Sequence, residues 1–210
     1  EESVTGLTSA QMTDKSLFTE FDFSVTPTEL SWMILDGVTA PYLGWQDMGL
    51  LGQGTESDPF QIATLADLRA LSETSVVGFW SAGVHYELTA NINASDTSSW
   101  NIGDHDGDAG TGTANQAMGF SPIGNVTDKF QGTFNGAGFT ITGLTINRPA
   151  SVYVGLFGFL GESGSISALG LEGGSVSGDY FVGGLIGLNR GTITASYVTG
   201  SVSGDYDYVG

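Results

Sequence analysis

The chain has 210 residues and a formal net charge of −18, from 23 acidic residues against 5 Lys and Arg. A nucleic-acid binder needs Lys and Arg to displace counterions from phosphate, so these few scattered cations exclude that class and disfavour anionic membrane surfaces. The absence of cysteine excludes disulfides, thiolate metal sites and cysteine nucleophiles, and no apolar run is long enough to cross a bilayer.

Residues 1–52 are expected to form a small mixed α/β or β-rich module. Ser9 is a candidate cap for a short helix through Lys15, and Phe21–Val25 has the composition of a strand. Trp32–Leu35 and Thr39–Leu43 flank an Asp-Gly pair, which predicts a hairpin. A loose polar segment follows, and we place the domain boundary after residue 52.

Residues 53–85 are expected to cap the larger domain. Phe60–Ile62 reads as a short strand. Thr64 followed by Asp67 resembles a capping box, and three leucines after Thr64 fall at helical spacing, which predicts a short helix. A stack of repeats needs a cover over its first rung, and this helix would serve.

Residues 86–150 are expected to hold diverged rungs of a repeat structure. Tyr86–Ile92 alternates as a strand does, and Phe130–Asn147 reads as a first full rung that turns at Asn135-Gly136. The acidic segment 98–118 interrupts this pattern as an insertion.

Residues 151–210 contain two copies of one repeat and the start of a third. A separation of 27 positions relates Ile166 to Ile193 and Val182 to Val209, and self-similarity at such a period is typical of solenoids. The second copy has three strand-like runs without a helix: Val182–Leu188, Gly191–Val198 and Gly200–Ser203. The inward-facing residues are expected to be Val154, Leu156, Ile166, Leu169, Val176, Val182, Leu185, Ile193 and Val202.

Three strands per repeat predict a coil of roughly triangular section. The predicted fold class is mainly β: a right-handed parallel β-helix over residues 53–210 with a short capping helix, preceded by the small module. One repeat cannot bury its own apolar face, so the expected partners are neighbouring repeats of the same chain or like subunits.

Several ordered motifs resemble those of a known family. The elements VGGLIG, GTITASYVTGSVSG and YVG resemble the GLUG repeat of large bacterial surface proteins, including filamentous-haemagglutinin-like adhesins. Gly54–Leu71 and Phe120–Ile146 resemble the segments that open such an array, and Gly6–Trp45 resembles a module that closes a preceding one. The resemblance implies an extracellular or bacterial cell-surface location. It also implies that the chain is a segment of a longer protein, or a subunit whose tail completes another's start.

The clearest candidate metal site is acidic. Asp104, Asp106 and Asp108 lie close together in a Gly-rich loop, and carboxylate oxygens are the ligands that Ca²⁺ prefers. The spacing departs from an EF-hand, so a solvated acidic loop remains the alternative. No cofactor is required by this interpretation, and Ca²⁺ is the candidate ion. His105 stands beside these aspartates without a second histidine to complete a transition-metal site.

Candidate ligand-binding residues come from the repeat itself. Tyr153, Tyr180 and Tyr206 recur near the repeat spacing, and such an aromatic ladder could stack on a surface glycan or only on itself. The sequence shows no nucleophile elbow, P-loop or HExxH motif, so no catalytic residue is assigned and an enzyme is not expected.

The expected function is an extracellular structural or adhesive segment, a stalk or binding module, of a large surface protein. Two alternatives stay open. One is the non-catalytic β-helix part of a secreted polysaccharide-active enzyme or peptidase, and the other is a subunit of a self-assembling extracellular fibre.

Overall fold

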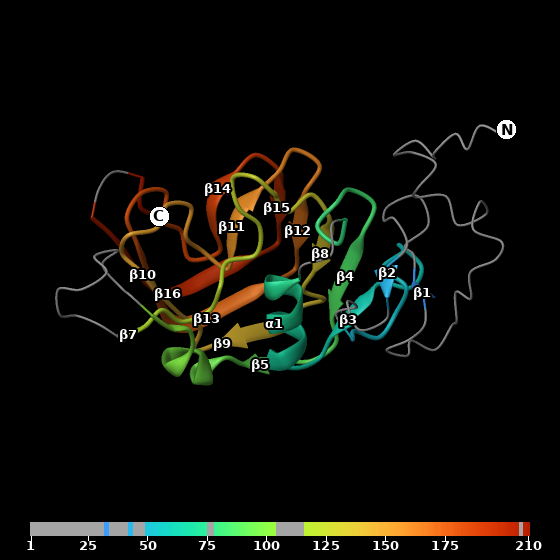
Figure 1. Ribbon diagram of the computed structural model, residues 1–210, viewed down its shortest axis with the longest axis horizontal. Coiled ribbons are helices and arrows are strands. Elements are labelled where there is room, and N and C mark those ends of the chain that lie inside the picture. Colours follow the sequence, from blue (N-terminus) through green and yellow to red (C-terminus); the bar gives the residue numbers. More distant parts are fainter. Residues whose placement is uncertain (1–31, 34–41, 44–48, 75–77, 104–115, 206–207) are drawn as a thin grey trace, which may run out of the picture.

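The computed structural model describes residues 32–33, 42–43, 49–74, 78–103, 116–205 and 208–210. Over these residues the chain is mainly β, and its parallel strands stack into a β-solenoid of about four turns with one α-helix (Figure 1). The predicted fold class is confirmed. The boundary at residue 52 stays a prediction.

The first face of the solenoid is a five-stranded parallel sheet in the order β15-β12-β8-β4-β3. Its register places Phe60, Tyr86, Phe134, Ile166 and Ile193 in one line across the sheet. Each occupies an inward position of its strand, so every rung contributes an apolar residue to the core from this face. The strands are β3 (Phe60–Ile62), β4 (His85–Leu88), β8 (Thr133–Asn135), β12 (Ser165–Ser167) and β15 (Thr192–Thr194).

The second face is also a parallel sheet. The long strand β13 pairs with β9 and β10 of the preceding rung on one edge and with β16 on the other. The register of β13 shifts between Glu172 and Ser175, where Gly173 and Gly174 both have a positive φ. The strands are β5 (Ile92–Asn93), β9 (Thr140–Thr142), β10 (Thr145–Arg148), β13 (Gly170–Gly178) and β16 (Tyr197–Gly204).

The third face is narrower. Strand β11 (Phe157–Leu160) pairs in parallel with β14 (Ile186–Asn189), and single bridges join Val154 to Val182 and Val182 to Val209. Strands β11, β12 and β13 follow one another in the chain and lie in three different sheets, so three strands make one rung. The triangular section expected from the repeat is therefore observed.

One predicted strand is in fact divided by a left-handed residue at a corner of the solenoid. The run Gly191–Val198 was expected to be continuous, but Ala195 has φ 49° and ends β15, and Val198 belongs to β16. Ala168, in the preceding rung, has φ 51° at the corresponding corner. A strand cannot continue through a left-handed residue, so the chain turns onto the next face there.

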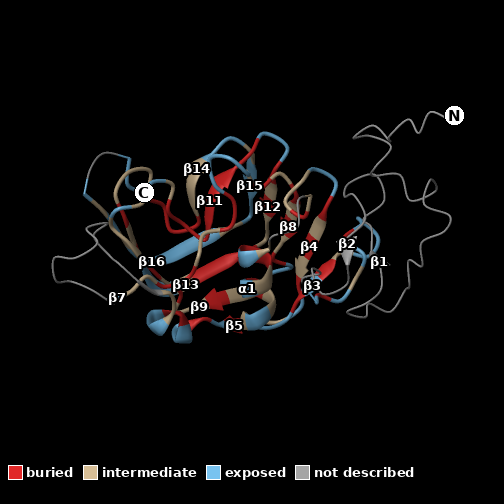
Figure 2. Cartoon of the chain, in the orientation of Figure 1, coloured by how far each residue is buried: buried red, intermediate tan, exposed pale blue. Residues whose placement is uncertain are grey.

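Burial falls towards the last rung. The predicted inward residues are buried in the earlier rungs, but Ile193 is 39% exposed, whereas Ile166 in register with it is fully buried. Val198 is likewise 39% exposed, against 2% for Leu171 beside it. Figure 2 shows this step as the buried β13 next to the exposed β16. The last described rung therefore has an apolar surface that no other described rung covers.

The predicted helix forms as α1 (Leu65–Glu73). Thr64 accepts a hydrogen bond from the backbone N–H of Asp67, and the Asp67 carboxylate accepts one from the N–H of Thr64, so the capping box is confirmed. Leu68 and Leu71 are buried in the common core. That α1 covers the first rung stays a prediction.

Ahead of the solenoid, β1 (Trp32–Met33) and β2 (Tyr42–Leu43) pair antiparallel, with Trp32 opposite Leu43. This agrees with the predicted hairpin, over shorter strands. The helix expected after Ser9 and the strand Phe21–Val25 lie outside the described residues.

Three elements occur that the sequence did not indicate. A 3₁₀-helix covers Ser95–Ser99, and the short strands β6 (Ile102–Gly103) and β7 (Gln116–Ala117) pair antiparallel at the base of the predicted insertion. The two described ends of the insertion therefore lie side by side as an antiparallel pair of strands.

Candidate functional site

A column of aromatic rings runs along one corner of the solenoid. The rings of Tyr153 and Phe181 stack with centroids 5.2 Å apart, and those of Phe181 and Tyr208 stack at 4.9 Å. Each residue directly precedes one of the bridged valines Val154, Val182 and Val209, so the three occupy one position in successive rungs. We call these three rings the ring column.

The rings that stack are not the three tyrosines that the repeat spacing predicted. Tyr153 is in line with Phe181 and Tyr208, whereas Tyr180 lies one residue earlier and Tyr206 lies outside the described residues. The reason is a single extra residue: 28 positions separate Val154 from Val182, but 27 separate Tyr153 from Tyr180. Whether any of these tyrosines binds a ligand stays a prediction.

The backbone of the ring column is left-handed. Tyr153, Phe181 and Tyr208 have φ of 59°, 53° and 71°. This conformation costs about 1–2 kcal/mol of free energy for a residue with a side chain. Each pair of stacked rings stabilises the fold by about 0.5–1.5 kcal/mol, which offsets part of that cost. Bulky residues therefore occupy a strained corner in three successive rungs.

Two cations flank a buried ring beside this column. Phe159 is 3% exposed, and its ring contacts that of Tyr153 with centroids 5.7 Å apart. The Nζ of Lys129 lies 5.2 Å from the Phe159 ring centroid, and the Cζ of Arg190 lies 5.6 Å from it. Both distances are within the range of cation–π contacts.

A surface cavity of about 230 Å³ opens next to Tyr153. Its walls come from two neighbouring rungs, one contributing the turn after Pro122 and the other the segment after Arg148. Glycine lets the rungs approach here, because a Cβ on Gly124 would come 2.8 Å from the carbonyl oxygen of Phe159. The lining residues are Pro122, Gly124, Asn125, Val126, Arg148, Ser151, Val152, Tyr153 and Val154.

Arg148 is the one charged residue among those lining residues. It ends β10 and is half-buried. Its Nε donates to the carbonyl oxygen of Phe120 at 3.1 Å, and its Nη2 donates to the Oγ of Ser121 at 3.0 Å. Burial lowers the pKa of the Arg148 guanidinium from its ordinary value, which an arginine tolerates without losing its charge.

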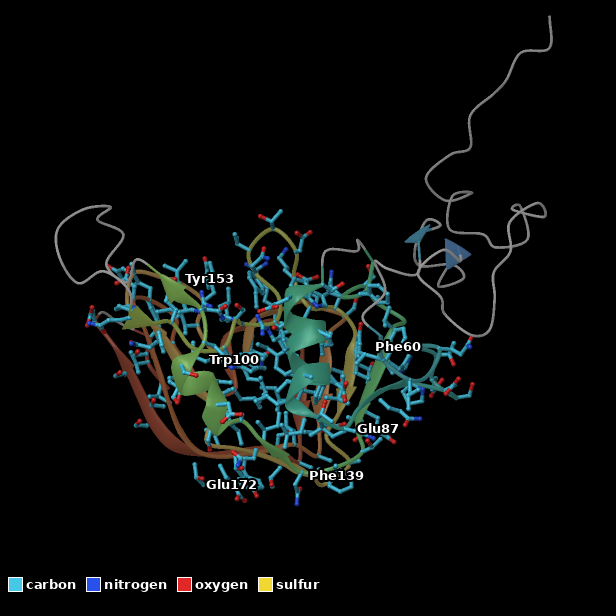
Figure 3. The ribbon with its side chains drawn as sticks, turned by 60° about the horizontal axis from the view of Figure 1, so that its bottom comes forward. Phe60, Glu87, Trp100, Phe139, Tyr153 and Glu172 are labelled. Carbon is cyan, nitrogen blue, oxygen red and sulfur yellow. The ribbon has the colours of Figure 1, made fainter. Side chains whose placement is uncertain are left out.

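The distribution of positive charge is uneven. Within the described ranges, Arg69 forms an ion pair with Glu73, and no such pair is found there for Lys129, Arg148 or Arg190. Phe159 and Tyr153 connect these three cations into one surface, which we call the basic–aromatic face (Lys129, Arg148, Tyr153, Phe159, Arg190). In Figure 3 Tyr153 lies at the upper side of the solenoid, and the labelled acidic residues Glu87 and Glu172 lie at the lower side.

The predicted metal ligands Asp104, Asp106 and Asp108 lie outside the described residues, as does His105. In the part of the chain that the structure describes, no three His, Cys, Asp or Glu residues gather as a metal site would require. Calcium binding by the acidic loop stays a prediction.

Comparisons with known proteins give two sequence relatives. The chain is 38% identical over 157 residues to halomucin of Haloquadratum walsbyi, a match that covers 73% of this chain and 2% of that protein. It is 33% identical over 145 residues to a protein of Evansella cellulosilytica named "Putative Gly-rich membrane protein", covering 68% of this chain and 14% of that one. The chain thus spans a small part of the length of the relatives it matches.

No family model matches the chain, so the resemblance to GLUG repeats is not confirmed. Among solved structures, a crystal structure from Bacteroides ovatus described as "a putative immunoglobulin A1 protease" aligns with a TM-score of 0.47 and 19% identity. That alignment covers 72% of this chain and 40% of the other. Within the described residues, no helix has the length and apolar character needed to span a bilayer.

Sequence reasoning missed most of the basic–aromatic face. No local motif in the sequence marks Lys129, Arg148, Phe159 or Arg190 as a functional residue. A signal for the ring column was present: Tyr153, Phe181 and Tyr208 are each followed by Val-Gly. Alignment on that Val-Gly pair, instead of on tyrosine, finds the three rings that stack.

Proposed function

We propose that this chain is a structural and adhesive segment of a large extracellular or cell-surface protein, in which the solenoid spaces and presents a lateral binding face. The observation that carries this proposal is the register of the rungs. Phe134, Ile166 and Ile193 repeat one inward position, and each rung advances the scaffold by about 4.8 Å. Such stacking gives a stiff rod with a long lateral surface.

The sequence relatives support this location. Halomucin is named for a mucin, and the Gly-rich protein of Evansella cellulosilytica is named for a membrane. This chain covers 2% of the length of the first and 14% of the length of the second. A short match within very long proteins suits a segment that serves a larger architecture. We propose the same placement here.

We propose a non-catalytic role for the segment. His85, the histidine that the described ranges contain, begins β4, and no hydrogen bond joins its ring to a serine or threonine hydroxyl there. Acyl transfer by a serine needs that contact. Two screens test the non-catalytic role: one for new N-termini after incubation with proteins, and one for reducing ends and unsaturated sugars after incubation with polysaccharides. Release of any of these products would contradict it.

Surface labelling of intact cells tests the location. Antibodies raised against residues 49–210 are expected to label unpermeabilised cells of the source organism, and brief protease treatment of those cells is expected to remove the label. A cytoplasmic protein serves as the control for lysis. Labelling that appears only after permeabilisation would contradict the proposal.

A second candidate, a self-assembling fibre subunit, is favoured by the last rung. Ile193 and Val198 are each 39% exposed, Val209 is 42% exposed, and among the described strands β16 pairs on one edge only, with β13. The rung that fits this surface is a further copy of the same repeat, because the surface reproduces the register of buried rungs. Sedimentation velocity over a range of concentrations tests this candidate.

Under that candidate, particles grow with concentration, and Ile193→Lys abolishes growth because it places a charge in the apolar contact. The matched control is Thr192→Lys, next to it on the outward side of β15. A monomer at all concentrations would contradict the fibre candidate and leave the stalk proposal standing.

A further inference from the structure

We infer that the basic–aromatic face binds a carboxylated sugar, with Arg148 pairing with the carboxylate and Tyr153 lying beside the sugar ring. The inference deepens the adhesive part of the proposed function by naming a ligand class. It does not depend on the stalk role, and its test is separate from surface labelling.

Arg148 has the hydrogen-bonding capacity that a carboxylate needs. A guanidinium carries five N–H donors, and two of them are used by Phe120 and Ser121. These two bonds hold the planar group in place, so little side-chain entropy is lost when an anion arrives. Nη1, which makes no hydrogen bond to a described residue, and the second N–H of Nη2 remain for a two-point contact with an oxyanion.

The position of Arg148 favours an incoming anion. The guanidinium is partly desolvated, and within the described ranges no carboxylate lies within 4 Å of it. A partly buried cation without a counter-ion is costly, and an anionic ligand in the cavity would relieve that cost.

The rim of the cavity suits a ring with apolar faces. Val126 is 58% exposed and Val152 is 48% exposed, and both line the cavity beside Tyr153. Phe181, in the following rung, covers one side of the Tyr153 ring, while the opposite cavity wall comes from the preceding rung. A pyranose presents C–H groups to aromatic and aliphatic surfaces and carries its carboxylate at the edge, which matches this arrangement.

Lys129 and Arg190 extend the same chemistry beyond the cavity. Both lie over Phe159, whose ring contacts Tyr153. Three of the chain's 5 cations are therefore gathered on one face of a molecule with a net charge of −18.

The many carboxylates outside this face repel an acidic polymer, and salt screens that repulsion. The affinity for an acidic polymer should therefore not fall between about 0.01 and 0.15 M salt, over which the Debye length falls from about 30 to 8 Å.

Two sources of a carboxylated sugar are distinguished by the ligands used in the test. Isothermal titration calorimetry would use residues 1–210 with trigalacturonate for uronate polymers and 3′-sialyllactose for sialylated glycans. Methyl-esterified trigalacturonate and lactose are the matched neutral controls. We expect heat with at least one acidic ligand and none with its neutral control at the same millimolar concentration.

Arg148→Gln is expected to weaken that binding by roughly 10- to 100-fold, the range for loss of a hydrogen bond to a charged group. Arg69→Gln removes the same charge far from the face and should change affinity by no more than about twofold. Circular dichroism checks that both variants fold. If Arg148→Gln does not fold, the double variant Lys129→Gln/Arg190→Gln replaces it with the same expected direction.

Amide chemical shifts of the wild-type chain give a readout without mutation. The acidic sugar is expected to move the signals of Asn125, Val126 and residues 151–154. The inference is overturned by absent binding of both acidic ligands, by equal binding of acidic and neutral sugars, by equal effects of Arg148→Gln and Arg69→Gln, or by shifts elsewhere. A C-terminal peptide carboxylate that binds in place of the sugars would also overturn it.

Discussion

At the scale of single residues, Ile166 and Ile193 are a matched pair. They occupy the same register position on β12 and β15, and they are 0% and 39% exposed. Ile166→Ala is expected to cost about 2–5 kcal/mol of unfolding free energy, because it leaves a cavity in a closed core. Ile193→Ala should cost about 1–2 kcal/mol, since its side chain is only partly removed from water.

Urea unfolding of both variants at low protein concentration measures this difference. The wild-type midpoint, and an unchanged slope with denaturant, serve as the reference. Equal losses for the two variants would contradict an open last rung, and would indicate that Ile193 is covered by another molecule in solution.

Tyr197 offers a second test at this scale. Its hydroxyl donates to the Glu172 carboxylate at 2.5 Å, and this bond, with smaller contributions from desolvation and the Glu172 charge, raises the pKa of Tyr197 above its ordinary value. The bond favours the protonated phenol, so it is present at neutral pH and is lost as pH rises through the raised pKa.

Ultraviolet titration of the tyrosinates, read as the difference between wild type and Tyr197→Phe, isolates this phenol. We expect the isolated phenol to ionise above the range of a free tyrosine, and Glu172→Gln to shift its ionisation downward. A curve that Glu172→Gln leaves unmoved would show that the bond does not form in solution.

At the scale of elements, the N-terminus of α1 is held by side chains. Asp67 Oδ2 accepts from the backbone N–H groups of Ala63 and Thr64 at 3.0 and 2.9 Å, and Thr64 Oγ1 accepts from the N–H of Asp67. Thr64→Ala is expected to lower the unfolding free energy by about 1 kcal/mol. Thr64→Ser keeps the hydroxyl and should stay near wild type in the same denaturant titration. If the two variants are equally destabilised, the cap is not the source of the effect.

The sequence predicted the helices and strands better than it predicted the site. Alternation and the 27-residue period led to the stacked strands, and Thr64 with Asp67 led to α1, because both signals are local and depend on few residues. The left-handed corner at Ala195 was missed, since alanine carries no turn signal.

The candidate site was predictable only in part. Tyr153 was singled out, but its partners Phe181 and Tyr208 were missed, because one rung is a residue longer and an alignment on tyrosine hides the register that the Val-Gly pair preserves. Arg148 could not be recognised, because its cavity is formed by segments about 25 residues apart in sequence, one on each of two rungs.

At the scale of the whole molecule, the net charge of −18 acts against compactness. The melting temperature is expected to rise as NaCl increases from about 0.01 to 0.15 M, because screening weakens repulsion among the carboxylates. The effect should shrink near the isoelectric point of about 4.1, where the net charge vanishes. Differential scanning calorimetry at both pH values measures it, and a melting temperature independent of salt at neutral pH would contradict this account.

The register of the solenoid underlies the fold and the proposed function, and cysteine cross-linking tests it directly in a chain that has no cysteine of its own. Ser167 and Thr194 are register partners on β12 and β15, and neighbouring strands are about 4.8 Å apart, within the reach of a disulfide. Ser167→Cys/Thr194→Cys is expected to oxidise to an intramolecular disulfide. Ser167→Cys/Thr192→Cys, displaced by two residues along the strand, is expected to remain reduced under the same conditions. Equal or faster cross-linking of the displaced pair would contradict the register and the solenoid built on it.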